Sequence, residues 1–255
     1  MHPTDVSTIL PAFQTIDLRR LAAVDFEGRV DTKFVFPHYK LADFLKIIEN
    51  DAILLEVNGE RLFHYRNIYL DTEEYSFFAM HRAGRKNRLK IRARAYHTDG
   101  PFVFEIKRKN NKGLTIKKRI SLPSFDDVYS TETEEFLQSE LGKGFDDFPR
   151  HTVVNYSRMT FANKAMTEKF TIDIQLHTRV NEAVLPFTGI VIAELKQPRF
   201  KYDSIFMRAL KHLRIYPGSF SKYCAAVMRV NADIKRKKFN KLIKKIKKIE
   251  HATLT

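Results

Sequence analysis

Cysteine is almost absent from this sequence, because Cys224 is the single one in 255 residues. One thiol excludes an internal disulfide framework and fits a reducing compartment. The sequence also lacks an uncharged run of about 18 apolar residues, so we expect no transmembrane helix. Asp17, Arg19 and Arg20 interrupt the N-terminal region before any long apolar core forms, so we expect no secretory signal. The expected location is the cytoplasm.

Acidic residues are too few to balance the basic ones. The chain has 45 Lys and Arg against 30 Asp and Glu, a net charge of +15 and a pI near 9.8. Such a balance predicts an anionic partner: nucleic acid, a membrane surface or a phosphorylated small molecule. The excess is uneven, since residues 235–248 hold nine cations and no acid. We therefore divide the chain into a body, residues 1–234, and a basic tail, residues 235–255.

Three runs in the middle of the chain, residues 88–96, 102–109 and 114–120, alternate strictly between two kinds of side chain. One parity is aliphatic and the other carries long cations, such as Lys90, Arg92 and Arg94. Period-two alternation predicts strands, and the short breaks at residues 99–101 and 110–113 predict antiparallel neighbours. Because like charges on adjacent strands destabilise a sheet, a face so rich in cations indicates a polyanion ligand. The other interpretation is a solvated face with counterions.

The predicted fold class is α+β, an eight-stranded antiparallel β-barrel with helices packed on its exterior. The expected strands lie near residues 29, 65, 88, 102, 114, 152, 169 and 190. Eight antiparallel strands can close into a barrel that encloses side chains or one ligand. Amphipathic helices are expected after residues 37, 73, 126, 204 and 219, a short helix over residues 15–24, and a hairpin at Asn58-Gly59. Alternation leaves open whether the cations point inward, beneath covering helices, or outward into water.

The polar parity forms an ordered pattern along the chain. It reads Arg29-x-Asp31-x-Lys33, Lys90-x-Arg92-x-Arg94, Glu105-x-Lys107, Lys117-x-Arg119, Tyr156-x-Arg158, Lys169-x-x-x-Asp173, Glu194-x-Lys196 and Ser221-Lys222-Tyr223. This order resembles the VTC domain, the polyphosphate polymerase-like branch of the triphosphate tunnel metalloenzyme superfamily, and most of all its bacterial members. The resemblance covers about residues 15–230. It implies a tunnel lined by basic residues that holds a triphosphate or polyphosphate.

The resemblance also implies roles for individual residues. Glu194 matches the family's metal-binding glutamate and Lys222 a lysine near the reaction centre, so these two are the catalytic candidates. Tyr156 matches an aromatic near the nucleotide base. The residues that match phosphate contacts are Lys33, Arg92, Arg94, Lys107, Lys117, Arg119, Arg158, Lys169 and Lys196. The implied cofactor is a divalent metal, Mn²⁺ or Mg²⁺, and the implied partners are ATP and polyphosphate.

Two positions depart from the wider superfamily. Its first strand carries Glu-x-Glu-x-Lys, whereas this chain has Arg29 and Asp31 before Lys33, which argues against thiamine-triphosphatase or adenylate-cyclase-like members. Lys169 replaces an arginine and loses its bidentate geometry while keeping the charge. Asp31, Glu105 and Asp173 are expected to pair with neighbouring cations rather than to bind the metal, because pairing is the commoner role of such carboxylates.

The chemistry of these residues fits phosphoryl transfer, which depends on positioning and charge neutralisation. The expected function is a metal-dependent polyphosphate polymerase-like enzyme that transfers the terminal phosphate of ATP to a polyphosphate chain. One alternative is a hydrolase of tripolyphosphate or nucleoside triphosphate on the same tunnel. Another is a non-catalytic module that binds polyphosphate or inositol phosphates. Nucleic acid is disfavoured, because the basic faces carry few aromatics for base stacking apart from Tyr96 and Tyr156.

The tail has an apolar stripe at helical spacing, made by Phe239, Leu242, Ile243, Ile246 and Ile249. One interpretation is that this stripe packs on the body and leaves the lysines in water. A second places the stripe at a membrane surface with the lysines on anionic lipid, which would make the protein membrane-associated. A third is an electrostatic role, in which the lysines gather ATP or retain a growing chain.

Overall fold

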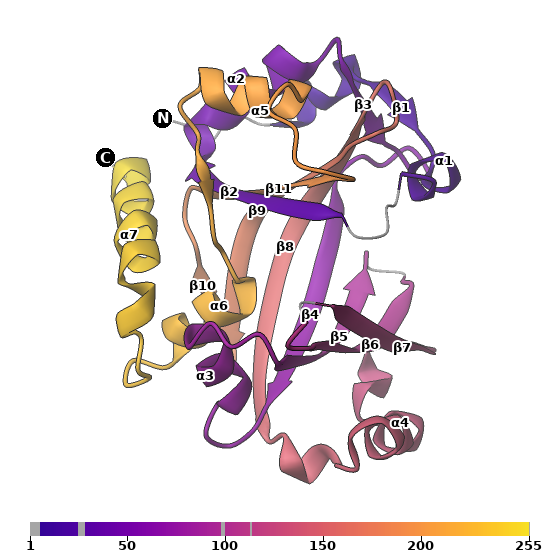
Figure 1. The fold of residues 1–255 in the computed structure, drawn as a ribbon, viewed down its shortest axis with the longest axis vertical. Coiled ribbons are helices and arrows are strands. Elements are labelled where there is room, and N and C mark those ends of the chain that lie inside the picture. Colours follow the sequence, from indigo (N-terminus) through magenta and orange to yellow (C-terminus); the bar gives the residue numbers. More distant parts are fainter. Residues whose placement is uncertain (1–5, 25–28, 98–99, 113, 255) are drawn as a thin grey trace.

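The computed structural model describes residues 6–24, 29–97, 100–112 and 114–254 (Figure 1). The chain has an α+β fold built on one large, almost wholly antiparallel sheet. Its principal strands are β2 (Val30–Pro37), β4 (Phe63–Asp71), β5 (Arg88–Tyr96), β6 (Phe102–Lys109), β7 (Thr115–Leu122), β8 (Arg150–Asn163), β9 (Lys169–Val180) and β11 (Ile190–Gln197). All eight expected strands are therefore present. The predicted turns of the central meander include residues 99 and 113, which lie outside the described residues.

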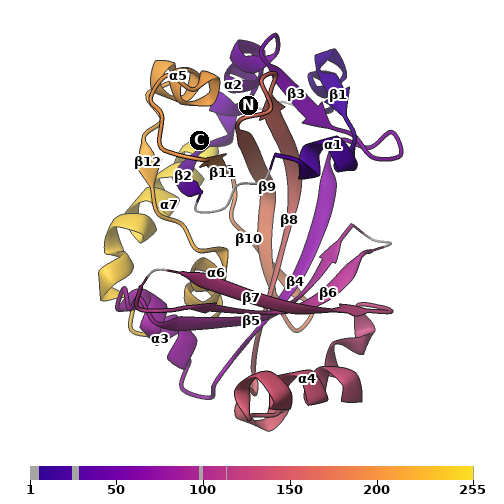
Figure 2. The ribbon, with the colours of Figure 1, turned by 45° about the vertical axis from the view of Figure 1, so that its right-hand side comes forward.

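Four short strands extend the sheet: β1 (Gln14–Ile16), β3 (Ala52–Leu55), β10 (Ala183–Pro186) and β12 (Pro217–Gly218). The hydrogen-bonded order along its main path is β12-β2-β11-β9-β8-β4-β5-β6-β7. Strands β5, β6 and β7 run across the direction of β8 and β9, so the sheet is strongly twisted (Figures 1 and 2).

The predicted closed barrel is not confirmed. Within the described ranges β7 pairs with β6 alone and the opposite end of the path is β12, so the sheet is not closed. The alternation in a strand specifies its two faces, but it carries no information about whether two edge strands meet. The number of strands was therefore predictable and the closure was not.

Helices cover the aliphatic face of the sheet. Helices α2 (Leu41–Ile48) and α5 (Ile205–His212) pack on the outer side chains of β2, β8, β9 and β11 in one large core. Helix α4 (Thr131–Leu141) covers the equivalent face of β5 and β6, where Leu137 contacts the core that holds Ile91 and Phe104. The expected packing of helices on the aliphatic face is therefore confirmed, and the cations lie on the opposite face of an open sheet.

Two further helices lie on the cationic side, at one end of the sheet. Helices α3 (Ser76–Arg82) and α6 (Lys222–Val230) contact each other and share a core with Tyr69 and Val154 of the sheet. Ser221 begins α6 by accepting a hydrogen bond from the Cys224 amide, as expected for a serine cap. Asp71 fixes the pair, because its carboxylate accepts the amides of Phe77 and Phe78 and the hydroxyl of Tyr223.

The tail forms α7 (Asn240–Leu254), which runs along the side of the body (Figure 1). Ile246 and Ile249 are buried in the α6 core, and Phe239, Leu242 and Ile243 pack against it. The interpretation that the stripe packs on the body is confirmed, while the lysines of α7 are exposed. None of the described helices is long and apolar enough to cross a membrane.

Two local predictions were wrong. Residues 15–24 do not form one helix, because they hold the end of β1 and then α1 (Leu18–Ala22), which begins at the Asp17 cap. Asn58-Gly59 makes the predicted tight turn, which an antiparallel bridge between Val57 and Glu60 closes, but this pairing does not continue into β3 and β4. Each instead pairs with a different stretch of β8, whose 14 residues are long enough to serve both.

Candidate functional site

One face of the sheet carries the expected site residues. Directly opposed residues of antiparallel strands point to the same face, and the register opposes Lys33 to Glu194, Lys196 to Lys169 and Lys107 to Lys117. We call this surface the basic face. The register places on it Lys33, Lys90, Arg92, Arg94, Lys107, Lys117, Arg119, Tyr156, Arg158, Lys169, Glu194 and Lys196. Lys222 reaches the same face from the first residue of α6.

Glu194 lies between two lysines. One carboxylate oxygen contacts the Lys33 ammonium, and the other lies 2.5 Å from Nζ of Lys196. Lys196 also reaches Asp31 at 3.4 Å, so two carboxylates share this ammonium group. Burial and then repulsion from Lys196 lower the pKa of Lys33 to about 7. Asp31 therefore has the pairing role expected from the sequence.

Asp173 holds two cations from different elements. Its carboxylate accepts two hydrogen bonds from Arg158, one from Nε at 2.6 Å and one from Nη2 at 2.9 Å, which makes a bidentate pair. The same carboxylate also contacts the Lys222 ammonium. Its carboxylate side chain is only 3 % exposed. Although burial raises the pKa of Asp173, Arg158 and Lys222 hold it far below its usual range. Asp173 therefore fixes α6 to β8 and aims Lys222 at the basic face.

Another carboxylate of the basic face, Glu105, is 4 % exposed and lies 2.6 Å from Nη2 of Arg92. Arg92 also donates to the Tyr69 hydroxyl at 3.4 Å, and Arg94 donates to the Asn67 side-chain oxygen at 2.9 Å. Burial alone raises the pKa of Tyr69, but the cations around it lower the value to about 8. The face is therefore strongly electropositive where β4 and β5 meet.

The cations further along the sheet are more open to solvent. Lys107, Lys117 and Arg119 are exposed on β6 and the edge strand β7. Across β6 and β7 the register opposes Lys107 to Lys117, so two like charges lie side by side there, and it opposes Glu105 to Arg119, which carry opposite charges. These side chains are placed to meet an anion that approaches from solvent.

A group of tyrosines lies at the end of β5 remote from α3. Tyr65 stacks on Tyr156 with ring centroids 5.1 Å apart, and it contacts Tyr96 edge-on. Arg94 and Arg158 lie over these rings, and Nζ of Lys222 is 4.4 Å from the Tyr156 centroid. Tyr156 is buried, with Tyr65, Arg158 and Lys222 against its ring. Aromatic rings at these positions favour nearby cations through their negative faces.

Sequence reasoning missed the contributions of β4. Tyr65, Asn67 and Tyr69 lie on the basic face and contact Arg94, Arg158 or Arg92, yet none was a candidate. Their common parity is a signal that could have found them. The other parity of β4 mixes His64 and Arg66 with Ile68 and Leu70, so its alternation of polar and apolar residues is weak.

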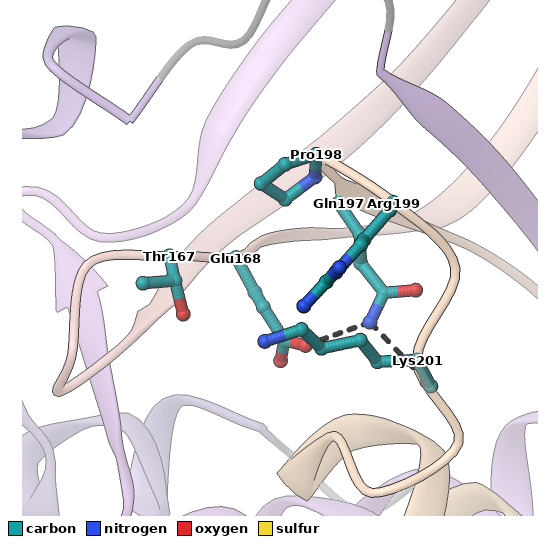
Figure 3. Close-up of a pocket in the computed structure, with 6 residues that line it drawn as sticks. All are labelled: Thr167, Glu168, Gln197, Pro198, Arg199 and Lys201. Carbon is teal, nitrogen blue, oxygen red and sulfur yellow. Dashed lines mark hydrogen bonds between the residues drawn. The ribbon is translucent and has the colours of Figure 1, made fainter.

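A small cleft lies where β9 begins and β11 ends. It is lined by Glu168, Gln197, Arg199 and Lys201, among others (Figure 3). The buried Glu168 carboxylate accepts from Gln197 at 2.7 Å and from the Ser204 hydroxyl at 2.7 Å. Ser204 in turn caps α5. Glu168 is therefore engaged by the protein, and its role is to anchor α5.

The residues around Glu194 fit a divalent metal only if the substrate supplies some of its ligands. Among the described residues, no three His, Cys, Asp or Glu side chains gather in one place. Glu194 and Asp31 do lie around the shared Lys196. Mg²⁺ and related hard cations often use one or two carboxylates together with substrate phosphate oxygens. This donor set suits a metal that is held jointly with a phosphorylated substrate.

Comparisons with known proteins give one family and several similar folds. The VTC domain family model matches residues 28–231. HpAC1 from Hippeastrum, an adenylyl cyclase candidate described as having a dominant triphosphatase activity, aligns with a TM-score of 0.51 at 13% identity, covering 79% of this chain and 95% of that one. An adenylate cyclase candidate from Bacillus halodurans aligns with a TM-score of 0.48 at 15% identity, covering 76% and 95%. The search of curated proteins found no match.

Proposed function

This chain belongs to the VTC domain family, and we propose that it is a metal-dependent enzyme that transfers the terminal phosphate of ATP to a polyphosphate chain. The observation that carries the proposal is the basic face, on which cations from eight elements surround four paired carboxylates. Such an arrangement can hold several linked phosphates in line, which is the main requirement of phosphoryl transfer.

In this proposal the substrate phosphates lie along the cations of the basic face. The terminal oxygen of the chain attacks the γ-phosphorus of ATP, the bond from that phosphorus to the bridging oxygen breaks, and ADP leaves. Lys222 contacts the phosphate in transfer, and Arg158 lies beside it through their common partner Asp173. A divalent cation would neutralise charge on the phosphate oxygens, held by Glu194 with Asp31 nearby.

We also propose that the phosphate-binding residues implied by the family resemblance contact the substrate phosphates. Arg92, Arg94 and Arg158 offer planar forks, which match phosphate geometry, and the lysines offer compact charges. Tyr156 enters the proposal as a neighbour of Lys222, whose Nζ lies 4.4 Å from its ring centre. Contact between this ring and a nucleotide base would require Lys222 to move aside.

Hydrolysis is the second candidate, favoured by the fold shared with HpAC1, which is described as a triphosphatase. Here water replaces the chain terminus as the attacking group, and the same cations serve. Incubation of the protein with ATP and Mn²⁺, followed by gel electrophoresis and phosphorus NMR, separates the two. A polymerase yields ADP and a ladder of polyphosphate, whereas a hydrolase yields orthophosphate without a ladder. Absence of turnover with retained polyphosphate affinity would contradict both and indicate a binding module.

A further inference from the structure

A second cationic site lies outside the basic face, where β5 begins. A cleft of about 790 Å³ is bounded by α3, the following loop and the adjoining ends of β5 and β6. Figure 2 shows α3 beside this end of the strands. Four arginines line the cleft, Arg82, Arg85, Arg88 and Arg108, and none of the described residues that line it is acidic. The site therefore favours an anion.

Most of this positive charge has no protein partner. Arg82 donates to the backbone oxygen of Lys235 at 2.8 Å. Within the described parts of the chain, the guanidinium groups of Arg85, Arg88 and Arg108 make no hydrogen bond or ion pair. Guanidinium groups that are not engaged by the protein are ready to bind phosphate or to stack on a flat ring.

The floor of the cleft is apolar, unlike the basic face. Phe77, Met80 and Leu89 line it, together with two alanines of α3 and the loop. A simple phosphate chain gains nothing from such a floor, because apolar surface is covered favourably only by apolar groups. Asn87 on the rim adds an amide that can donate and accept at the edge of a base. The lining thus suits a ligand with a flat ring and a negatively charged end.

The cleft adjoins the basic face at Arg88, whereas Leu89 and Arg108 oppose each other on the aliphatic face of the sheet. Arg88 lines the cleft and opens β5, and Lys90, Arg92 and Arg94 follow it at alternate positions on the basic face. Two residues of strand span about 7 Å, so a triphosphate starting at Arg88 reaches Lys90 directly. Tyr156 lies at the other end, opposite Tyr65 and hence Tyr96, about 26 Å along β5 from Arg88.

We infer that this cleft holds the nucleoside end of a nucleoside polyphosphate whose phosphates run onto the basic face through Arg88 and Lys90. The inference rests on the proposed function, since it requires phosphate binding by the basic face. It adds a base site at the opposite end of β5 from Tyr156, whose ring is already covered by Tyr65 and Lys222.

Binding of ATP and tripolyphosphate, measured by calorimetry without metal, tests the inference. The double variant Arg85→Ala/Arg108→Ala should weaken ATP binding about tenfold and change tripolyphosphate binding less than about twofold, since tripolyphosphate has no base. Met80→Gln should weaken ATP binding in the same selective way. Lys211→Ala, an exposed cation on α5, is the matched control and should change neither affinity. Arg85→Lys/Arg108→Lys keeps the charge and should still lose part of the ATP affinity.

Photolabelling of the unmodified protein gives a second readout. Irradiation with 8-azido-ATP should label the peptide that spans residues 76–89, and tripolyphosphate in excess should prevent labelling. Labelling of the peptide that contains Tyr156 would overturn the inference. Equal losses of ATP and tripolyphosphate binding in the arginine variant would also overturn it, because the cleft would then be a general phosphate surface. If the wild-type protein binds neither compound, the proposed function fails first, and this outcome is distinct from selective failure of the cleft.

Discussion

The two halves of the basic face differ in how their cations are partnered. On β2, β8, β9 and β11, Lys33 and Lys196 contact Glu194, and Arg158 contacts Asp173 together with Lys222. The sequences of β5, β6 and β7 contain one carboxylate, Glu105, and it forms an ion pair with Arg92. We call these the paired half and the open half. The paired half is fixed by its own carboxylates, whereas the open half keeps positive charge available for a ligand.

This difference suggests a division of labour within the proposed function. Catalytic groups must be held in a defined geometry, and buried ion pairs with several hydrogen bonds provide it. Chain binding needs charge that is free to exchange between phosphates, and exposed lysines provide that. The four changes that follow test the comparison, from the largest expected effect to the smallest.

Glu194→Gln should have the largest effect on activity. The carboxamide keeps the shape but lacks the anionic oxygen that a hard divalent cation requires, so metal-dependent turnover should fall by about 100-fold or more. Tripolyphosphate binding without metal should be retained, because Lys33 and Lys196 remain. Turnover with Mn²⁺ and calorimetry in chelator are the two measurements. Glu140→Gln, in the exposed pair with Lys118, is the matched control, and wild-type turnover in Glu194→Gln would remove Glu194 from the metal site.

Asp173→Ala should have the largest effect on stability. The change leaves Arg158 and Lys222 without their buried partner, and loss of one member of such a group costs about 3 kcal/mol of unfolding free energy. Urea denaturation measures this loss. Because the ligand supplies negative charge to the same cations, saturating tripolyphosphate should restore part of the stability. A variant as stable as the wild type would show that the paired half is not held by its carboxylates.

The sequence predicted the basic face better than the shape of the sheet around it. Strict alternation in β5, β6 and β7 assigns Arg92, Lys107 and Lys117 to one side, because side-chain parity is a local property. The sequence also predicted that Asp173 pairs with a neighbouring cation, which the structure identifies as Arg158 together with Lys222. The stacking of Tyr65 on Tyr156 was not, since it depends on β4 lying between β5 and β8, a long-range arrangement.

The failed hairpin has the same cause. The Asn58-Gly59 turn forms as its residues require, with positive φ at both positions. The strands on either side nevertheless pair with residues of β8 that lie 79 or more positions away in the chain, and they bury their side chains in cores that no local pattern specifies. Turn chemistry is local, whereas strand pairing is decided by the whole sheet.

Arg92→Ala and Lys117→Ala compare a paired with an unpaired cation within the open half. Arg92→Ala leaves the buried Glu105 carboxylate without its partner and should cost about 2 kcal/mol of unfolding free energy. Lys117→Ala removes an exposed charge opposite Lys107, so stability should hold or rise slightly. Both variants should weaken tripolyphosphate binding. Urea denaturation and calorimetry check these outcomes, and equal stabilities would show that Glu105 gains nothing from Arg92.

The smallest expected effect is a dependence of tripolyphosphate binding on pH. Burial lowers the pKa of Lys90 from 10.5, and repulsion by Arg92 and Arg88 lowers it further. The groups that face Lys90 are Tyr69 of β4, Cys224 of α6, Arg88 and Arg92 of β5, and Lys107 of β6. Lys90 therefore loses its proton in the folded protein at a lower pH than in the unfolded chain.

The sign of the two consequences is opposite. Between the folded pKa of Lys90 and 10.5, the unfolded chain binds more protons, so the stability of the ligand-free protein should rise with pH in this interval. Affinity for tripolyphosphate should fall over the same interval, by about threefold, because one cation of the face is neutralised. Lys90→Met should make both curves less steep without flattening them, because Lys33, with a pKa of about 7, and Lys107 and Lys196, with pKa values of about 8, also lose their protons below 10.5. Lys117→Met should leave the shapes of the curves unchanged. Parallel curves for wild type and Lys90→Met would show that Lys90 does not titrate in this range.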